Sequence, residues 1–525
     1  MTALRTDPAA GPAGVIAPPA IAAGSALLVF AGVQAAAWRI VGGFEYPLDD
    51  VYIHLAVAEQ IAAGNYGVNS GEVSSPASSP LYPLLLVPFA GTEAQRLLPL
   101  AWNVAGLAAS AALFARILGQ AGLRGWPALA LAAAAPLAAN MPGLAATGME
   151  HSLHMAASLA LLSGLFDTLR TGRIGALLVA GVVLAPALRP EGLALALAAA
   201  GAVAFTGRPG AGAGLAALGI APQAAFAGFL VALGLEPMPS SVLTKLGPGE
   251  TGPVSIDLSA PPGQALFGLT LLAALAAPRA ARRGARAAAW IAGVAVLAGA
   301  AHLLAGRIGW LNRYEPYAVA VVLAGAAAAV LALEGRLRAV FAAGLLAGGV
   351  VLAGHYTLRG LPLVATNPLL IQLQQAQMAR FAREHARVPV AVNDLGRVSW
   401  SNPAPVLDLW GLASAEARRV RLSDPAPGWA GPLAERHGVE LAMIYDAWLA
   451  EAPGPGWVRL GTLRFDHAAP RMQAIGSRER AFFAGGFAVA FYATRPGAVG
   501  PLESALEPWA AGLPEGARFV RAARP

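Results

Sequence analysis

Residues 125–149 read GWPALALAAAAPLAANMPGLAATGM, a run of 25 residues without a charged side chain. An α-helix rises about 1.5 Å per residue, so such a run can cross roughly 30 Å of hydrocarbon. Similar apolar stretches recur at residues 16–37, 97–115, 210–235, 258–277, 287–306, 316–333 and 339–358, with shorter ones at 151–166, 174–188 and 192–207. The sequence therefore predicts a polytopic α-helical membrane protein with about eleven transmembrane helices.

The composition agrees with a membrane location. Charged residues make up 12% of the 525 residues, roughly half of what is usual in soluble domains. Residues 356–525 hold 32 of the 65 charges, and the longer part before them holds 33. We therefore expect a short N-terminal segment (1–15), a transmembrane domain (16–358) and a soluble C-terminal domain (359–525). This balance excludes a disordered chain and an ordinary cytosolic enzyme, and the absence of cysteine excludes disulfides and thiol nucleophiles.

The positive charges predict the orientation. The loops at one end of the predicted helices carry 12 basic and 3 acidic residues, whereas the loops at the other end carry 6 basic and 12 acidic residues. By the positive-inside rule the first end is cytoplasmic. We therefore expect a multi-pass protein of the bacterial cytoplasmic (inner) membrane with an extracytoplasmic C-terminal domain. The apolar stretch 80–90 is too short to span and is expected to be re-entrant or interfacial.

The first outer loop, residues 41–80, contains adjacent carboxylates at Asp49 and Asp50. Apolar residues follow them at helical spacing up to the stop signal Gly64, so a short amphipathic helix on the membrane surface is expected. Adjacent acids at a membrane boundary resist joint ionisation, which suits a general base or a ligand of a divalent cation, Mg²⁺ or Mn²⁺. The alternative is a solvated helix N-terminus, where acids interact favourably with the helix dipole.

Several motifs of this loop and of later segments occur in a characteristic order. They are LDDVYI (48–53), AGNYGVNSGE (63–72), SSPL (78–81), TGME (147–150), RPEG (189–192), PSSVLTK (239–245), NRY (312–314) and VLDLWGL (406–412). The ordered set resembles the GT-C glycosyltransferases, especially the branch of the mycobacterial arabinofuranosyltransferases. That resemblance implies a polytopic enzyme that takes a sugar from a polyprenyl-phosphate carrier. The chain departs from the family at 55–57 and near Ser240, where the family often has Arg and Asn respectively.

The resemblance also implies roles for residues of the first outer loop. Asp49 or Asp50 would be the catalytic base and, as in some relatives, could share a divalent cation. Tyr52 and Glu72 would lie near the substrate. No other cofactor is expected.

Charged residues of the other outer loops are further candidates, each with a structural alternative such as helix capping, a local ion pair or interfacial anchoring. Guanidinium and ammonium groups suit a lipid phosphate, and carboxylates and phenols suit a sugar. Lys245 is the only lysine of the chain. The candidates for binding the donor phosphate are Arg189, Lys245 and Arg313, and those for binding substrate are Glu150, Glu191 and Tyr314.

The C-terminal domain alternates helical and strand patterns. An amphipathic helix is predicted at 372–387 and strands at 388–392, 406–409, 440–445, 457–465 and 482–494. The mixture predicts a small α/β domain. Asp394 and Asp408 end predicted strands, where capping of a turn is a simpler role than contact with a sugar. We expect this domain to bind the acceptor or to cover the active site.

These observations predict a membrane glycosyltransferase, hexosyl or pentosyl, that uses a polyprenyl-phosphate-linked sugar and an extracytoplasmic glycan, glycolipid or glycoprotein acceptor. The alternative is a polyprenol-sugar flippase or transporter without transferase activity. Transporters commonly carry internal repeats with matching broken helices, and we find none in the sequence. Of the 36 basic residues 35 are Arg, and they form no basic patch, so no nucleic-acid partner is expected.

Overall fold

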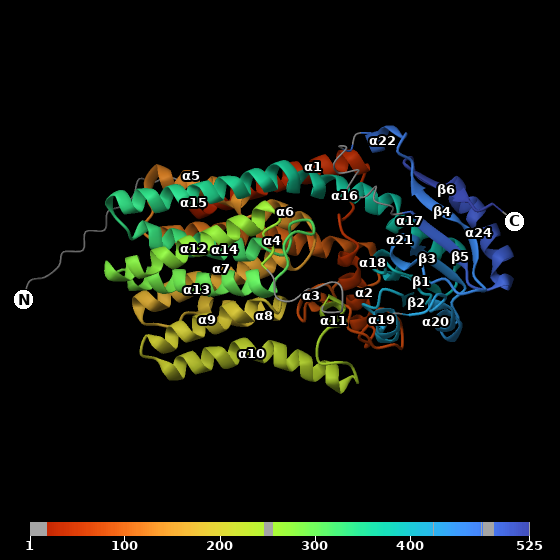
Figure 1. Ribbon diagram of the computed structural model, residues 1–525, viewed down its shortest axis with the longest axis horizontal. Helices are drawn as coiled ribbons and strands as arrows, with labels where there is room; N and C mark the ends of the chain where they lie inside the picture. Colours follow the sequence, from red (N-terminus) through yellow and green to blue (C-terminus); the bar gives the residue numbers. More distant parts are fainter. Residues whose placement is uncertain (1–17, 246–255, 424, 474, 476–487, 524–525) are drawn as a thin grey trace, which may run out of the picture.

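The computed structural model describes the chain except residues 1–17, 246–255, 424, 474, 476–487 and 524–525. The described part is mostly helical, with a bundle of long helices at one end and a small sheet at the other (Figure 1). Seven helical segments are long and apolar enough to cross a membrane: α1 (Pro18–Val41), Glu93–Gln120 with α4 (Leu98–Gln120), α7 (His151–Thr171), α10 (Pro209–Ala232), α12 (Pro261–Arg282), α13 (Arg286–Ala305) and Gly335–Ala386, which begins with α15 (Gly335–His355).

Four shorter apolar helices complete the bundle: α5 (Gly125–Ala138), α8 (Ala176–Leu188), α9 (Gly192–Phe205) and α14 (Pro316–Leu331). The number of membrane crossings stays a prediction. The stretch 125–149 is not one helix, because Asn140 adopts a left-handed conformation (φ 49°) and separates α5 from α6 (Met141–Ala146). Residues 80–90 contain only the single turn α3 (Tyr82–Leu85), so they do not cross as a helix.

The bundle packs through small residues. A Cβ atom on Gly164 of α7 would lie 2.3 Å from the backbone nitrogen of Leu178, and one on Gly181 of α8 would lie 2.4 Å from that of Leu161. The two backbones therefore approach more closely than any side chain would allow, as is common between membrane helices. Of the seven long helices, α7 is the most enclosed, because 83% of its most apolar segment of 18 residues is buried.

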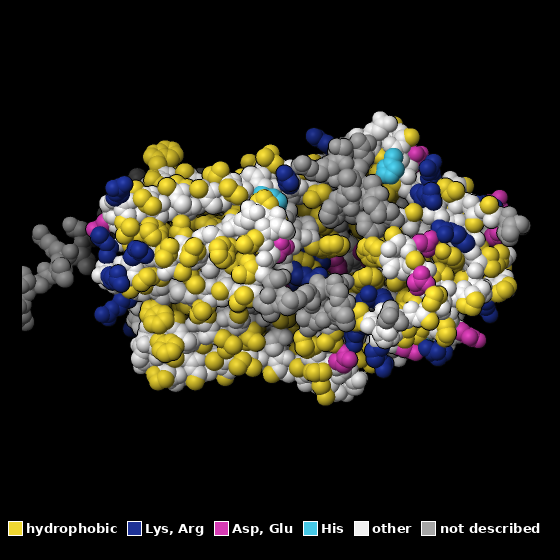
Figure 2. Space-filling model, in the orientation of Figure 1, with side chains coloured by type: hydrophobic (Ala, Val, Ile, Leu, Met, Phe, Trp, Pro, Cys, Tyr) yellow, Lys and Arg dark blue, Asp and Glu magenta, His cyan; other side chains and the backbone are white. Residues whose placement is uncertain are grey.

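The arginine-bearing loops lie at the end of the bundle opposite the sheet. Arg116 pairs with Asp167 at 2.8 Å, and Arg208 donates to the carbonyl of Gly172 at 2.8 Å, so three of these loops meet. On the face shown in Figure 2, Lys and Arg side chains gather at this end, and hydrophobic side chains cover the flank. The two ends thus differ in charge as the sequence predicts, while their orientation in a membrane remains a prediction.

The C-terminal domain contains a six-stranded sheet of order β2-β1-β3-β5-β4-β6. Strand β1 (Val390–Val392) lies parallel to β2 (Val406–Asp408) and β3 (Leu441–Tyr445), and the other pairs, with β4 (Val458–Phe465), β5 (Val489–Ala493) and β6 (Ala517–Arg521), are antiparallel. The five predicted strands are confirmed within the described residues, and β6 was not predicted. The proposed boundary at 358/359 falls inside the helical run Gly335–Ala386, so the helix itself enters the domain.

The domain rests on the first outer loop. Helix α2 (Asp50–Ala62) forms as predicted, but it is not amphipathic with one exposed face, since all residues from Val51 to Ala58 are buried. Its place along a membrane surface stays a prediction. Glu59 of α2 accepts hydrogen bonds from the backbone and hydroxyl of Ser401, at 2.9 and 2.8 Å. The amide of Asn69 exchanges two hydrogen bonds with the backbone of Val406, at 3.0 and 2.8 Å, and so extends the edge of β2.

Candidate active site

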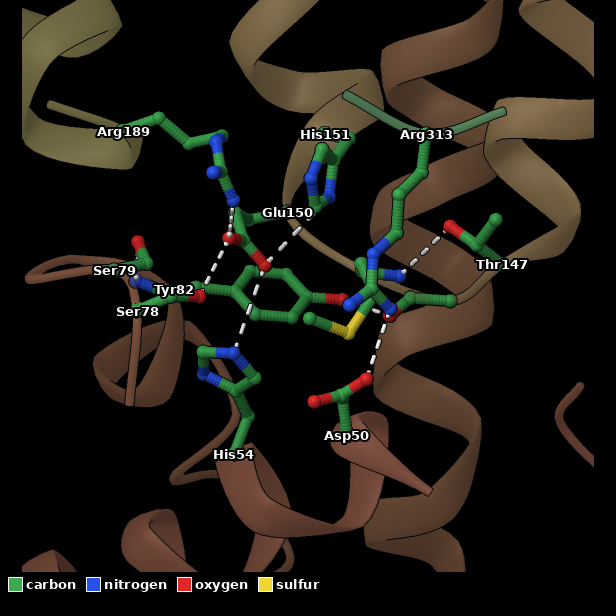
Figure 3. A network of polar contacts seen from close by, with 12 residues as sticks. Asp50, His54, Ser78, Ser79, Tyr82, Thr147, Glu150, His151, Arg189 and Arg313 are labelled. Carbon is green, nitrogen blue, oxygen red and sulfur yellow. Dashed lines mark hydrogen bonds and ion pairs between the residues drawn. The ribbon is translucent and has the colours of Figure 1, made fainter. Parts of the chain in front are cut away.

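A polar pocket lies where α2, the adjoining end of the bundle and the C-terminal domain meet. Residues of seven separate segments line it, among them Asp50, His54, Ser78, His151, Arg189, Ser241, Arg313, Tyr314 and Leu412. Figure 3 shows most of the charged members pointing toward one another. The free volume is about 30 Å³, which is sufficient to hold water.

Asp50 and Arg313 form the ion pair nearest the solvent. The Nη1 atom of Arg313 lies 2.9 Å from Oδ2 of Asp50, and the side chains are 4% and 34% exposed. The other terminal nitrogen of Arg313 donates to the hydroxyl of Tyr314 at 3.0 Å. The exposed face of Asp50 makes it the carboxylate that an incoming ligand reaches first.

The loop before α14 that presents Arg313 is tightly constrained. Trp310, Leu311 and Asn312 all have left-handed φ values, of 47°, 61° and 50°. Such conformations cost non-glycine residues about 1–3 kcal/mol each, so the surroundings must hold them. One stabilising contact is a hydrogen bond of 2.9 Å from the side chain of Asn140 to the carbonyl of Asn312. The break between α5 and α6 thus fixes the loop that carries Arg313.

Glu150 is the centre of a buried network (Figure 3). The side chain is fully buried, and its Oε1 accepts hydrogen bonds from Arg189 at 2.7 Å and Ser78 at 2.9 Å. The other oxygen, Oε2, faces His54 Nε2 at 3.6 Å and His151 Nδ1 at 4.0 Å. Glu150 therefore joins the first outer loop, α7 and the turn after α8.

Arg189 is held by two carboxylates. Besides Glu150 it binds Glu191 in a bidentate arrangement, at 2.7 and 3.2 Å. Both the predicted local pair with Glu191 and a longer-range pair with Glu150 are thus present. The guanidinium groups of Arg189 and Arg313 also lie over the ring of Tyr314, 5.7 and 5.0 Å from its centroid. Arg189, Arg313, Glu150 and Tyr314 therefore come together, as does Glu191 through Arg189.

Asp49 points away from the pocket. Its two carboxylate oxygens accept the backbone N–H groups of Gly396 (2.7 Å) and Arg397 (2.8 Å), at the start of α18 (Gly396–Ser399). A Cβ atom on Gly396 would lie 2.1 Å from the Asp49 carbonyl oxygen, so only glycine permits this approach. Burial at the junction, together with the nearby Asp394 carboxylate, raises the pKa of Asp49 well above its usual range. Asp49 therefore docks the C-terminal domain on α2.

Tyr52 and Glu72 lie outside the pocket. The hydroxyl of Tyr52 donates to Glu45 and accepts from Arg96, and its ring is completely buried. Glu72 accepts a hydrogen bond of 2.8 Å from Asn69, the residue that extends β2. Both side chains support the fold of the loop and neither lines the pocket, so their contact with substrate stays an untested prediction.

Two further candidates have different outcomes. Lys245 ends α11 (Ser240–Lys245), and its side chain lies outside the described residues. A divalent cation shared by Asp49 and Asp50 does not fit, because both oxygens of Asp49 bind backbone amides and Asp50 faces a guanidinium. The described part of the chain also holds no group of three or more His, Asp or Glu side chains that could bind a metal ion.

The fold also brings to this region His54 and Ser78, which were not predicted as site residues, and Asp394, which was expected to cap a turn rather than to contact a sugar. His54 follows Asp50 by four residues, so both lie on one face of α2, and this spacing was a usable signal. Burial lowers the pKa of His54. Asp394 accepts hydrogen bonds from Gln375 (2.9 Å) and Tyr445 (2.7 Å), and burial raises its pKa. Ser78 binds Glu150 across 72 positions of sequence, for which no local signal exists.

Asp408 has the capping role that was the simpler expectation. It is fully buried at the end of β2, and its two oxygens accept the backbone N–H groups of Trp410 and Ala413, each at 2.8 Å. Burial raises the pKa of Asp408 to about 6. The turn that it holds ends at Leu412, which lines the pocket.

Comparison with known proteins bears on the C-terminal domain. The family model of a domain of unknown function, DUF8728, matches residues 369–492. No curated protein matches the chain significantly. The matched segment includes β1 to β5, the glycine that meets Asp49 and the turn that carries Leu412, so it covers the part of the domain that rests on the first outer loop.

Proposed function

We propose that the protein is a membrane glycosyltransferase that moves a sugar from a polyprenyl-phosphate donor to an extracytoplasmic acceptor. The observation that carries the proposal is a partly exposed carboxylate, Asp50, paired with Arg313 in a pocket that Arg189 also lines, at one end of an apolar bundle. A carrier of this class needs apolar surroundings for its chain and cationic groups for its phosphate. The ordered motifs of the outer loops resemble those of GT-C enzymes and support the same class.

In this reaction Asp50 accepts the proton of the acceptor hydroxyl. The acceptor oxygen attacks the anomeric carbon of the sugar, the bond between that carbon and the phosphate oxygen breaks, and its electron pair stays on the polyprenyl phosphate. General base catalysis of this kind contributes about 10²- to 10⁴-fold in rate. No step requires a cation bound between Asp49 and Asp50.

Arg313 is the better candidate of the two arginines for binding the phosphate. Arg189 already faces Glu150 and Glu191, whereas the Nε of Arg313 has no hydrogen-bond partner among the described residues. Preorganised cations stabilise the charge that develops on a leaving phosphate. We therefore assign to Arg313 contact with the departing phosphate and to Arg189 the positioning of Glu150.

The orientation belongs to the same proposal. We place the pocket and the C-terminal domain on the outer face of a bacterial cytoplasmic membrane, since the arginine-bearing loops meet at the other end of the bundle. The domain would then cover a head group whose lipid lies between the helices.

The test compares transfer by the purified full chain and two variants, with lipid-linked sugars and candidate acceptors. Asp50→Asn should lower transfer by about 10²- to 10⁴-fold. Glu72→Gln, which changes another carboxylate of the same loop outside the pocket, should stay close to wild type. Full transfer by Asp50→Asn would remove the proposed base. Reorientation of the carrier in vesicles, without any transfer, would favour the flippase.

A further inference from the structure

The pocket gathers acidic and basic side chains in a small space. Among side chains that line it or form an ion pair with a lining residue, three are carboxylates (Asp50, Glu150 and Glu191) and two are guanidinium groups (Arg189 and Arg313). A phosphate head group would bring a further negative charge into the pocket near Glu150, and burying like charges without compensation is strongly unfavourable.

His54 is placed to offset this added charge. Its side chain is 2% exposed and lines the pocket, and its Nε2 faces the Glu150 oxygen that accepts no hydrogen bond in the described part of the chain. Its Nδ1 likewise has no hydrogen-bond partner there. Figure 3 shows the imidazole opposite Arg189, with Glu150 between them.

The surroundings of His54 favour a proton only when a further negative charge arrives. Glu150 from the start of α7 and Asp50 from the same helix favour the imidazolium, while Arg189, Arg313 and burial oppose it. The ring of Tyr82, 5.3 Å away, closes the remaining side. Burial is the largest of these influences and lowers the pKa of His54, which favours the neutral imidazole in the free protein.

We infer that the pocket binds a phosphodiester head group together with one proton, and that His54 takes up this proton and faces Glu150 as an imidazolium. The inference rests on the proposed donor class and adds to it how the site accepts the charge. Uptake of one proton makes binding depend on pH, because the dissociation constant falls up to tenfold for each unit by which the pH decreases. Neutral ligands should bind without this dependence.

The test is calorimetric titration of the purified full chain with the methyl ester of polyprenyl phosphate. This diester carries one fixed negative charge, so any proton taken up belongs to the protein. Titrations at pH 7.5 in two buffers of different ionisation enthalpy give the number of protons. Wild type should take up about one proton, by linkage. His54→Asn should bind more weakly and take up almost none, while His467→Asn, an exposed histidine of the C-terminal domain, should match wild type.

Each other outcome has a distinct meaning. Binding by wild type without proton uptake would overturn the inference and leave the proposed donor intact. Uptake that persists in His54→Asn but disappears in His151→Asn would overturn the assignment to His54. Loss of binding in Lys245→Ala with no uptake by wild type would show that the ammonium supplies the compensating charge. No binding by wild type between pH 6 and 8 would refute the proposed donor class itself.

Discussion

Replacing Arg189 with methionine tests the network that supports the pocket. Glu150 is fully buried, and Arg189 supplies its closest cation, at 2.7 Å, with a side chain only 9% exposed. Methionine keeps much of the side-chain length but leaves Glu150 with Ser78 as its remaining hydrogen-bond donor. Removing one partner of a buried ion pair typically costs about 3–5 kcal/mol, because the other charge stays buried without compensation. We therefore expect Arg189→Met to be strongly destabilised.

The assay is thermal unfolding of the purified protein in detergent, followed by tryptophan fluorescence. A second variant, Arg189→Met with Glu150→Gln, removes the more deeply buried of the two carboxylates that lose their cation, Glu150 and Glu191, and should recover part of the lost Tm. The expected order of Tm is therefore wild type, then the double variant, then Arg189→Met. The reasoning would be refuted if Arg189→Met had the same Tm as wild type, or if the double variant had a lower Tm than Arg189→Met.

Three further changes test the C-terminal domain and its junction. Gly396→Ala places a Cβ atom 2.1 Å from the Asp49 carbonyl oxygen, so the domain should undock, with faster hydrogen exchange in β1 and α18; unchanged exchange would contradict the close approach. Asn69→Ala removes two hydrogen bonds to Val406 and should cost about 1–3 kcal/mol in the free energy of unfolding, measured by denaturant titration. Because the pKa of Asp408 is about 6 in the folded state and near 4 when unfolded, the native state holds the extra proton, and stability should fall as the pH rises from 4 to 6. Asp408→Asn should flatten this dependence in melting curves, and an unchanged slope would assign it to another group.

The hydropathy of the sequence predicts most of the long helices. The underestimated length of α7 and the absence of β6 from the predicted strands have physical causes. The run 151–166 seemed short because serine and histidine interrupt it, yet α7 extends over 21 residues and faces protein on nearly every side. A helix enclosed by other helices does not need the hydropathy of one that faces lipid. Strand β6 was not predicted, because two of its five residues are arginines. It lies at the edge of the sheet, where such charged side chains are tolerated.

The site was only partly predictable. The outer-loop motifs pointed to Asp50, Arg313, Glu150 and Arg189, and the fold does bring these side chains together. Their separation in sequence explains what was missed. Asp50 and Arg313 are 263 positions apart, and the partner of a buried carboxylate at such a distance is set by helix packing rather than by local pattern.

The two adjacent aspartates show this limit most clearly. In sequence they form one acidic pair, but successive residues of a helix differ by about 100° in direction, so a pair at a helix start cannot face one ligand. Asp49 turns to the backbone of α18 and holds the C-terminal domain, while Asp50 turns to Arg313 and the pocket. Their neutralisation should therefore have separable effects. Loss of the Asp49 charge acts on docking of the domain, and loss of the Asp50 charge acts on chemistry with the domain still docked.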